Sequence, residues 1–168
     1  HSETIGIDKF LEFYCQLEKM NIDIMLEVKD KNVSALKCIN CVSNRGIKVL
    51  EDEWERYKYF VLERSQENYL KIQELLHIKK SYPAIDMYRL IEETLKMPIS
   101  ISNAINAAQH VWRFLIEKVS ETEKKKFQRL LNKYSLNESS LKSVKNNLLM
   151  LARKYNEIKL LYGYYFYM

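Results

Sequence analysis

The sequence SNAINAAQHVWRFLIEKV, residues 102–119, predicts a buried central helix. At 100° per residue, its alanines and large apolar side chains cover most of the helix surface, as a core helix requires. The three alanines leave little side chain between this backbone and its neighbours, so other helices can pack closely against it. One narrow polar stripe interrupts the apolar surface, and its members lie within about 60° of one another: Asn106, His110, Arg113 and Glu117.

The composition favours helices on either side of that segment. The chain has 168 residues but only three Gly and two Pro, which leaves little material for hairpins or a glycine-rich phosphate loop. This length fits one domain that buries a sizeable core without disulfides or a structural metal. We therefore expect an all-α fold, a single-domain bundle of about six to eight helices around the central helix 102–119, with residues 1–168 as its extent.

The apolar runs are much shorter than the roughly 20 residues that a membrane span requires. No signal peptide opens the sequence. We expect a cytoplasmic protein without membrane partners.

Apolar side chains recur at helical spacing along most of the chain. Asp8 can cap a first helix that runs to about Met20, and a second apolar patch follows at residues 22–28, so that the two pieces are compatible with one bent helix. Ser120 and Glu123 have the spacing of a capping box, which predicts a helix start. The remaining helices are expected at residues 34–41, 50–80 with a break near Arg64-Ser65, 84–96, 120–134 and 141–155.

The net charge of +5 is concentrated in the last third of the chain. Residues 117–168 carry eleven Lys and Arg against five acids, whereas residues 1–116 carry sixteen against seventeen. Such asymmetry is typical of a phosphate-binding surface, although a lysine-rich solvated face gives the same pattern. The residues expected to bind nucleic acid are Lys118, Lys124, Lys125, Lys126, Arg129, Lys133, Lys142, Lys145, Arg153 and Lys154.

The polar stripe of the central helix is the candidate site for chemistry. His110 titrates near neutrality and could act as an acid or base, while Arg113 and Asn106 beside it could hold an anion. The competing interpretation is a polar residue satisfied within a helix interface. Cys38 and Cys41 form a lone CxxC without a second ligand pair, so we predict neither a metal site nor a cofactor.

The tail of the chain, residues 160–168, contains five aromatic residues. They can dock on the body of the domain or form an exposed surface for stacking or for a partner. Docking is favoured because exposed aromatic patches of that size are unusual on monomers.

The segment YKYFVLERSQENY, residues 57–69, resembles the signature of the YbgA-like family of bacterial domains of unknown function. The similarity continues through Asn106, His110 and Phe114, Thr122-Glu123, Tyr134 and the closing tyrosine-rich tail. It covers residues 50–168 as a YbgA-like core, while residues 1–46 form divergent N-terminal helices. In that family the domain occurs alone or fused behind a thiouracil-desulfidase-like iron–sulfur domain, which implies work on nucleic acid or modified nucleobases.

The chain also departs from the family pattern. It retains Lys58, Arg64, Asn106 and His110, which are therefore the candidate catalytic residues that the resemblance implies. It lacks the lysine expected within residues 113–116 and the arginine expected within residues 134–137. The departures imply a retained fold with altered or reduced activity.

Three classes of function follow from these features. The favoured one is an accessory domain whose basic C-terminal face binds nucleic acid, with RNA as the expected partner. The second is a protein-interaction module, such as a mobile-element inhibitor that binds a nuclease or a nucleoprotein. The third is an enzyme that acts on a nucleotide or nucleobase through His110 and Arg64. The sequence leans away from an enzyme and leaves the oligomeric state open.

Overall fold

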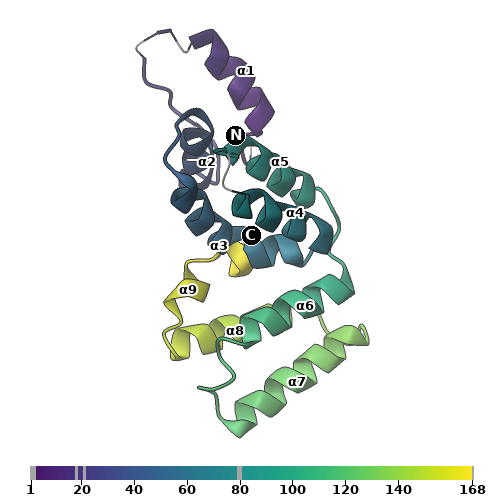
Figure 1. Ribbon diagram of the computed structural model, residues 1–168. Helices are drawn as coiled ribbons and strands as arrows, with labels where there is room; N and C mark the ends of the chain where they lie inside the picture. Colours follow the sequence, from purple (N-terminus) through teal and green to yellow (C-terminus); the bar gives the residue numbers. More distant parts are fainter. Residues whose placement is uncertain (1–2, 18, 21, 79–80, 168) are drawn as a thin grey trace.

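The computed structural model describes residues 3–17, 19–20, 22–78 and 81–167, and this part of the chain is an all-α single domain (Figure 1). The N-terminal helices lie at one end, and α6, α7 and α8 form the other end. The helices are α1 (Ile7–Leu17), α2 (Asn32–Val42), α3 (Ile47–Leu62), α4 (Gln66–His77), α5 (Ala84–Leu95), α6 (Ile101–Trp112), α7 (Glu121–Ser135), α8 (Leu141–Lys154) and α9 (Ile158–Leu161), followed by the 3₁₀ helix η1 (Tyr164–Phe166).

The predicted fold class is confirmed, with corrections to the number of helices, to the end of the central helix and to residues 22–28. The described residues form nine α-helices rather than six to eight, because the tail adds the one-turn helix α9. The central helix ends at Trp112, seven residues before the predicted end at Val119. Beyond it the backbone tightens into turns, in which the Leu115 N–H donates to the Trp112 carbonyl at 2.9 Å and the Lys118 N–H to the Leu115 carbonyl at 2.9 Å. Leu115 and Val119 nevertheless stay buried. The apolar residues up to Val119 therefore indicate burial in the core, and they do not indicate that the helix continues that far.

The apolar patch at residues 22–28 is not helical, contrary to the prediction of a bent helix. Residues 22–27 have no regular secondary structure, and Ile24, Leu26 and Val28 are half-buried while Ile22 and Met25 are exposed. The half-buried residues recur at every second position, which is the period of extended chain. This alternation is a signal for an extended segment.

Helix α3 joins the two larger apolar clusters of the domain. Tyr57 and Phe60 pack in a cluster with side chains of α4 and α5. Tyr59 and Leu62 pack in a second cluster with the alanines of α6 and the apolar faces of α7 and α8. The family signature at residues 57–69 therefore lies where the two halves of the bundle meet. Its break is at the predicted place, since Ser65 caps α4 by accepting a hydrogen bond from the Asn68 N–H at 3.1 Å.

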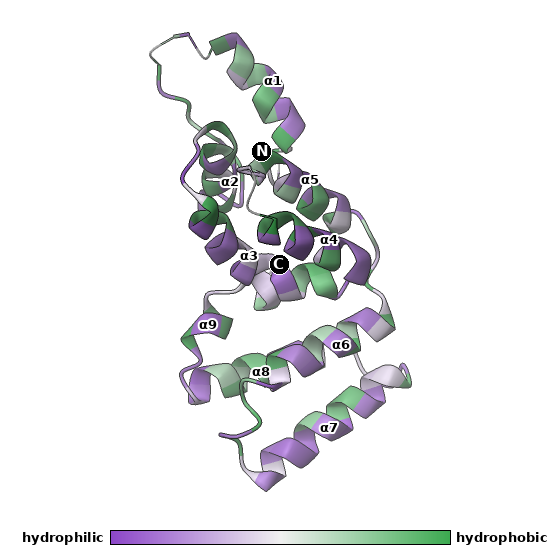
Figure 2. Ribbon diagram, in the orientation of Figure 1, coloured by the Kyte–Doolittle hydropathy of each residue, from purple (hydrophilic) through white to green (hydrophobic). Residues whose placement is uncertain are grey.

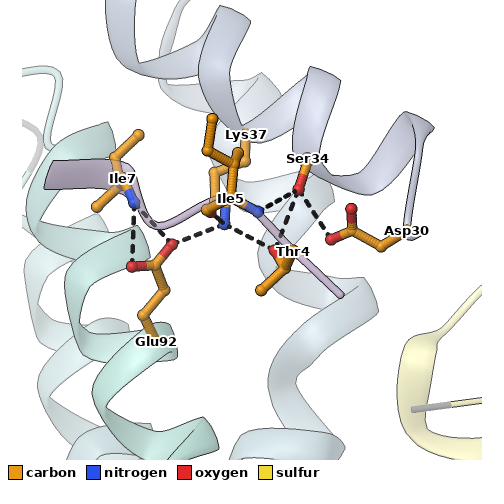
Figure 3. A network of polar contacts seen from close by, with 7 residues as sticks. All are labelled: Thr4, Ile5, Ile7, Asp30, Ser34, Lys37 and Glu92. Carbon is orange, nitrogen blue, oxygen red and sulfur yellow. Dashed lines mark hydrogen bonds and ion pairs between the residues drawn. The ribbon is translucent and has the colours of Figure 1, made fainter. Parts of the chain in front are cut away.

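A network of polar contacts holds the N-terminal segment against α2 and α5 (Figure 3). Lys37 is only 5% exposed, and its Nζ lies 2.6 Å from Glu92 Oε1. The same ammonium donates to the Ile5 carbonyl, and Glu92 accepts from the Ile7 N–H at 3.0 Å. A buried cation is therefore paired, as its desolvation demands, and the pair fixes residues 4–7 before α1 begins.

Candidate nucleic-acid interface

Helix α7 carries an uninterrupted row of basic side chains on its outer face, here called the α7 stripe: Lys125, Lys126, Arg129 and Lys133. At 100° per residue these positions lie within an arc of about 100°. All four side chains are exposed, and none forms an ion pair within the described part of the chain. Figure 2 shows α7 as largely hydrophilic, with hydrophobic positions between. The stripe is thus a solvent-facing row of positive charge without salt bridges to the residues that the structure describes.

The opposite face of α7 positions the stripe. Phe127, Leu131 and Tyr134 are buried against α6 and α8. The rings of Phe127 and Trp112 stack at 4.1 Å with an interplanar angle of 10°. The apolar face packs inward, so the four cations are held outward.

The start of α7 is fixed by the predicted capping box. Ser120 Oγ accepts from the Glu123 N–H at 3.3 Å, and Glu123 Oε2 accepts from the Ser120 N–H at 2.9 Å. Glu123 also pairs with Lys154 at 2.7 Å and accepts from the Tyr155 hydroxyl at 2.7 Å. The Lys154 ammonium, followed by the Ser120 N–H and the Tyr155 hydroxyl, lowers the pKa of Glu123 to about 2. Lys154 therefore binds α8 to the first turn of α7.

The predicted basic face of ten residues is divided by the structure. Besides Lys154, Lys118 pairs with Glu157 and Lys124 pairs with Glu121. Lys142 and Arg153 are exposed on α8 and form no ion pair with any described residue. The face is thus reduced to the α7 stripe with these two residues on the neighbouring helix.

Lys145 serves the core of the domain instead of its surface. Its Nζ lies 2.8 Å from Glu63 Oε2 and 3.0 Å from Oε1, and Glu63 is fully buried. Arg64 Nη1 contacts the same carboxylate and also donates to the Phe60 carbonyl at 3.3 Å. Burial lowers the pKa of Lys145, while the Glu63 carboxylate opposes that shift. Arg64 and Lys145 both compensate Glu63, and they connect the end of α3 to α8.

The other candidate residues lie along the seam between α3 and α6. At one end the Asn103 side chain donates to the Arg64 carbonyl at 3.1 Å. At the other end the His110 ring lies 6.4 Å from the Tyr59 ring, next to Lys58. Asn106 is half-buried on the same face of α6 as Asn103 and His110.

The His110 end of the seam is cationic. Burial, then the charges of Arg113 and Lys58, lower the pKa of His110 below its ordinary value of about 6.5. Each of these effects favours the neutral imidazole. Lys58 is itself paired with Glu55 at 2.7 Å. The four candidates thus line one seam, but Arg64 and His110 stand at opposite ends of it and are not brought to one reacting atom.

Cys38 and Cys41 lie near one another on α2 and are not reactive thiolates. Burial raises the pKa of Cys38 to about 11 and that of Cys41 to about 12. Within the described ranges, no group of three or more His, Cys, Asp or Glu side chains is placed to hold a metal ion. Nor does any described helix have the length and hydropathy to cross a membrane.

Two hollows that the sequence did not predict lie on either side of Tyr162. The larger, about 1160 Å³, lies between α3, α4 and α9 and includes Trp54, Glu55 and His77. The smaller, about 420 Å³, lies between the tail and residues 30–56. Arg56 and Tyr162 border both hollows. The tyrosine-rich tail is the part of this region that stands out in the sequence. Its partner Arg56 is 106 residues away, so no local pattern indicates the contact.

Comparison with known proteins gives two matches. The family model described as "Protein of unknown function (DUF1722)" matches residues 58–168. A protein named UV DNA damage endonuclease, from Clostridium perfringens (strain 13 / Type A), is 32% identical over 136 residues. That alignment covers 79% of this chain and 32% of the relative, so the chain spans about a third of the relative's length. No solved structure matches.

Proposed function

Because this chain belongs to the DUF1722 family of proteins of unknown function, which is the YbgA-like family that its sequence resembles, we propose a function from its own surface: it is an accessory domain that binds nucleic acid through the α7 stripe. The observation that carries this proposal is the row of four exposed cations without ion pairs on α7. The name of the relative, UV DNA damage endonuclease, supports nucleic acid as the partner.

The dimensions of the α7 stripe suit a phosphate backbone. Lys125 and Lys133 are eight residues apart, which corresponds to about 12 Å along an α-helix. Phosphates follow one another about every 3.4 Å of axis along one strand of DNA, so the stripe can follow about three or four of them. Long lysine side chains need no exact register with the phosphates, and such contacts position a protein without reading sequence. The expected binding is therefore strong at low salt and tolerant of sequence.

Two observations support an accessory role. The alignment covers only 32% of the relative, so about two thirds of that protein has no counterpart in this chain. Arg64 is engaged with the buried Glu63 and lies far along the seam from His110, so the enzyme hypothesis gains no support from their arrangement. The domain would contribute affinity, and the reaction would belong to another part of a larger protein or to a partner.

The kind of nucleic acid is the finer part of the proposal. The basic composition of the last third led us to expect RNA, whereas the name of the relative favours DNA. Fluorescence anisotropy with labelled single-stranded DNA, duplex DNA and RNA of one sequence ranks them directly. The measurement is repeated over a range of salt concentrations, because counterion release makes affinity depend on salt.

The decisive variant removes charge from the stripe only. Lys125→Gln, Arg129→Gln and Lys133→Gln together should reduce the salt slope for duplex DNA by about 2.7, because each phosphate that a cation neutralises contributes about 0.9 to that slope. The matched control removes the same charge elsewhere: Lys9→Gln, Lys71→Gln and Lys96→Gln, all exposed and outside α7. Equal affinity and salt slope for the two triple variants would overturn the proposal, since net charge would then explain the binding.

A protein-interaction module is the second candidate, and one observation favours it. Large apolar side chains are exposed in the N-terminal third, which precedes the family match at residue 58. Met25 is 82% exposed, and Met20, Ile22, Phe13 and Ile39 are each between 46% and 57% exposed. Co-purification with host lysate at high salt tests this candidate. If Met25→Ser and Ile22→Ser do not diminish a stoichiometric partner, this surface is not the interface.

A further inference from the structure

The tyrosine-rich tail divides into buried and exposed residues. Tyr164 and Tyr165 are 6% and 2% exposed, so part of the tail docks on the body as the sequence favoured. Tyr162 and Tyr167, in contrast, are 70% and 57% exposed. Both exposed rings border the smaller hollow, of about 420 Å³. The tail therefore places two aromatic side chains at the rim of a concave site.

Close packing against α3 fixes the geometry of this hollow. Arg56 Nε donates to the Tyr162 carbonyl at 3.2 Å, and its guanidinium lies 4.3 Å from the centre of the Tyr164 ring. Glu53 holds the same guanidinium at 2.8 Å. A Cβ at Gly163 would lie 3.3 Å from the Leu160 carbonyl oxygen and 3.6 Å from that of Arg56, so a side chain there would need a small shift of the Leu160 carbonyl. The tail therefore packs closely on α3 at this point.

Two polar atoms that line this region have no hydrogen-bond partner among the described residues. One is Oδ1 of Asp30, whose Oδ2 accepts from Ser34 at 2.9 Å (Figure 3). The other is the hydroxyl oxygen of the buried Tyr164. Both residues border the smaller hollow. Burial raises the pKa of Tyr164 to about 12, so its hydroxyl keeps its proton at neutral pH and remains a donor. Native proteins leave few buried polar groups unsatisfied, so this acceptor and this donor can each take a hydrogen bond from or to a bound molecule.

We propose that the hollow bordered by Asp30, Arg56, Tyr162, Tyr164 and Tyr167 binds an unpaired nucleobase, and this inference rests on the nucleic-acid binding proposed above. The rings of Tyr162 and Tyr167 provide stacking surfaces, which every base can use. Asp30 Oδ1 and the Tyr164 hydroxyl, which are buried atoms of residues that border the hollow, are the acceptor and the donor that the edge of a base would use.

This arrangement selects unpaired bases over paired ones. The Watson–Crick edge of each base has a donor next to an acceptor, which suits Asp30 and Tyr164 without preferring one base. In a duplex those groups are already used by the partner base. A volume of about 420 Å³ is in the range of small-molecule sites. The hollow would take a single-stranded or extruded base.

The first experiment uses free nucleosides, so that it does not depend on phosphate contacts. Adenosine and cytidine are titrated into the full chain and followed by NMR, with ribose as the control lacking a base. We expect shifts of the Tyr162 and Tyr164 signals with both nucleosides and none with ribose. Tyr162→Ala should weaken nucleoside binding about ten-fold through the loss of stacking. No response of the tail to either nucleoside would overturn the inference.

The second measurement separates a ligand site from a structural role. Tyr164→Phe removes only the hydroxyl that lacks a partner, so the midpoint of urea unfolding should stay unchanged or rise. Nucleoside binding should nevertheless weaken several-fold. A lowered unfolding midpoint, or unchanged nucleoside binding, would contradict the proposed role of this hydroxyl.

The third measurement separates this inference from the proposed function. A single-stranded oligonucleotide with abasic sites should bind the wild-type chain more weakly than the same oligonucleotide with its bases. Tyr162→Ala should abolish that difference and leave duplex affinity unchanged. If the stripe variant loses oligonucleotide binding while abasic and normal strands bind alike, the backbone contacts stand and the base site is wrong. If nucleosides bind but the stripe variant is normal, the base site stands and the proposed α7 interface is wrong.

Discussion

Replacing Lys37 by Met tests whether the buried ion pair of Figure 3 holds the N-terminal segment. The substitution removes the 2.6 Å contact with Glu92 and the hydrogen bond to the Ile5 carbonyl, but it retains a long apolar side chain. Loss of a charge-assisted hydrogen bond costs about 1.5–3 kcal/mol, and a buried carbonyl left without a donor costs about 1–3 kcal/mol. We expect the free energy of unfolding to fall by about 3 kcal/mol, the low end of the range for a broken buried pair. The low end applies because the Glu92 side chain is 18% exposed and regains some hydration.

Urea unfolding monitored by circular dichroism measures this change. For a chain of this length, a loss of about 3 kcal/mol corresponds to a fall in Tm of roughly 6–12 °C. The double variant Lys37→Met with Glu92→Leu removes both charges and should recover part of the loss, since no uncompensated carboxylate remains. Hydrogen exchange at the Ile7 N–H, which donates to Glu92, reports whether the opening is local.

Two outcomes would refute this reasoning. A loss below about 1 kcal/mol for Lys37→Met would place the pair among weakly coupled surface bridges. A double variant that is less stable than either single variant would show that burial of the charges does not govern the energetics. Lys29→Met is a suitable control, because Lys29 pairs with Glu3 on the same segment but is 61% exposed.

Three further predictions concern α6 and α7. Ser120→Ala should lower the free energy of unfolding by about 1 kcal/mol in chemical denaturation, because the capping box loses its side-chain acceptor. Lys154, followed by the Ser120 N–H, lowers the pKa of Glu123 to about 2. The ionised Glu123 therefore stabilises the fold fully above about pH 4.5, and this stabilisation is lost as pH falls towards 2. Carbonyl NMR should show the low pKa, and Glu123→Gln should remove this part of the acid sensitivity. Arg113→Gln should raise the pKa of His110 towards 6.5 in an NMR titration, because it removes a neighbouring cation while burial persists.

The helices with strong local signals could be predicted from the sequence. The errors at the end of α6 and at residues 22–28 have physical causes. Ser120 and Glu123 satisfy each other within one turn, so their spacing alone indicates the start of α7. The end of α6 depends on tertiary packing, because Leu115 stays buried although its N–H has changed to an i−3 bond. At residues 22–28 the apolar content suggests a helical patch, but the alternation of half-buried and exposed side chains is that of extended chain.

The candidate site was less predictable, because charge compensation comes from distant parts of the chain. Lys154 meets Glu123 across 31 residues, Lys118 meets Glu157 across 39, and Lys145 meets Glu63 across 82. Composition counts all three lysines as surplus charge, whereas the folded chain neutralises each of them. The hollow beside Tyr162 is similar, since it depends on Arg56 from α3 and Asp30 before α2.

The spacing of the cations on α7 differs from that on α3 and α4. On α3 and α4, Lys48 and Lys71 pair with acids at i,i+4. On α7, Lys125, Arg129 and Lys133 follow one another at that same spacing, where like charges destabilise a helix by about 0.2–0.5 kcal/mol per pair. The capping box and the buried apolar face offset this repulsion in the free protein. An anion bound along the stripe, as the proposed function requires, would relieve this repulsion.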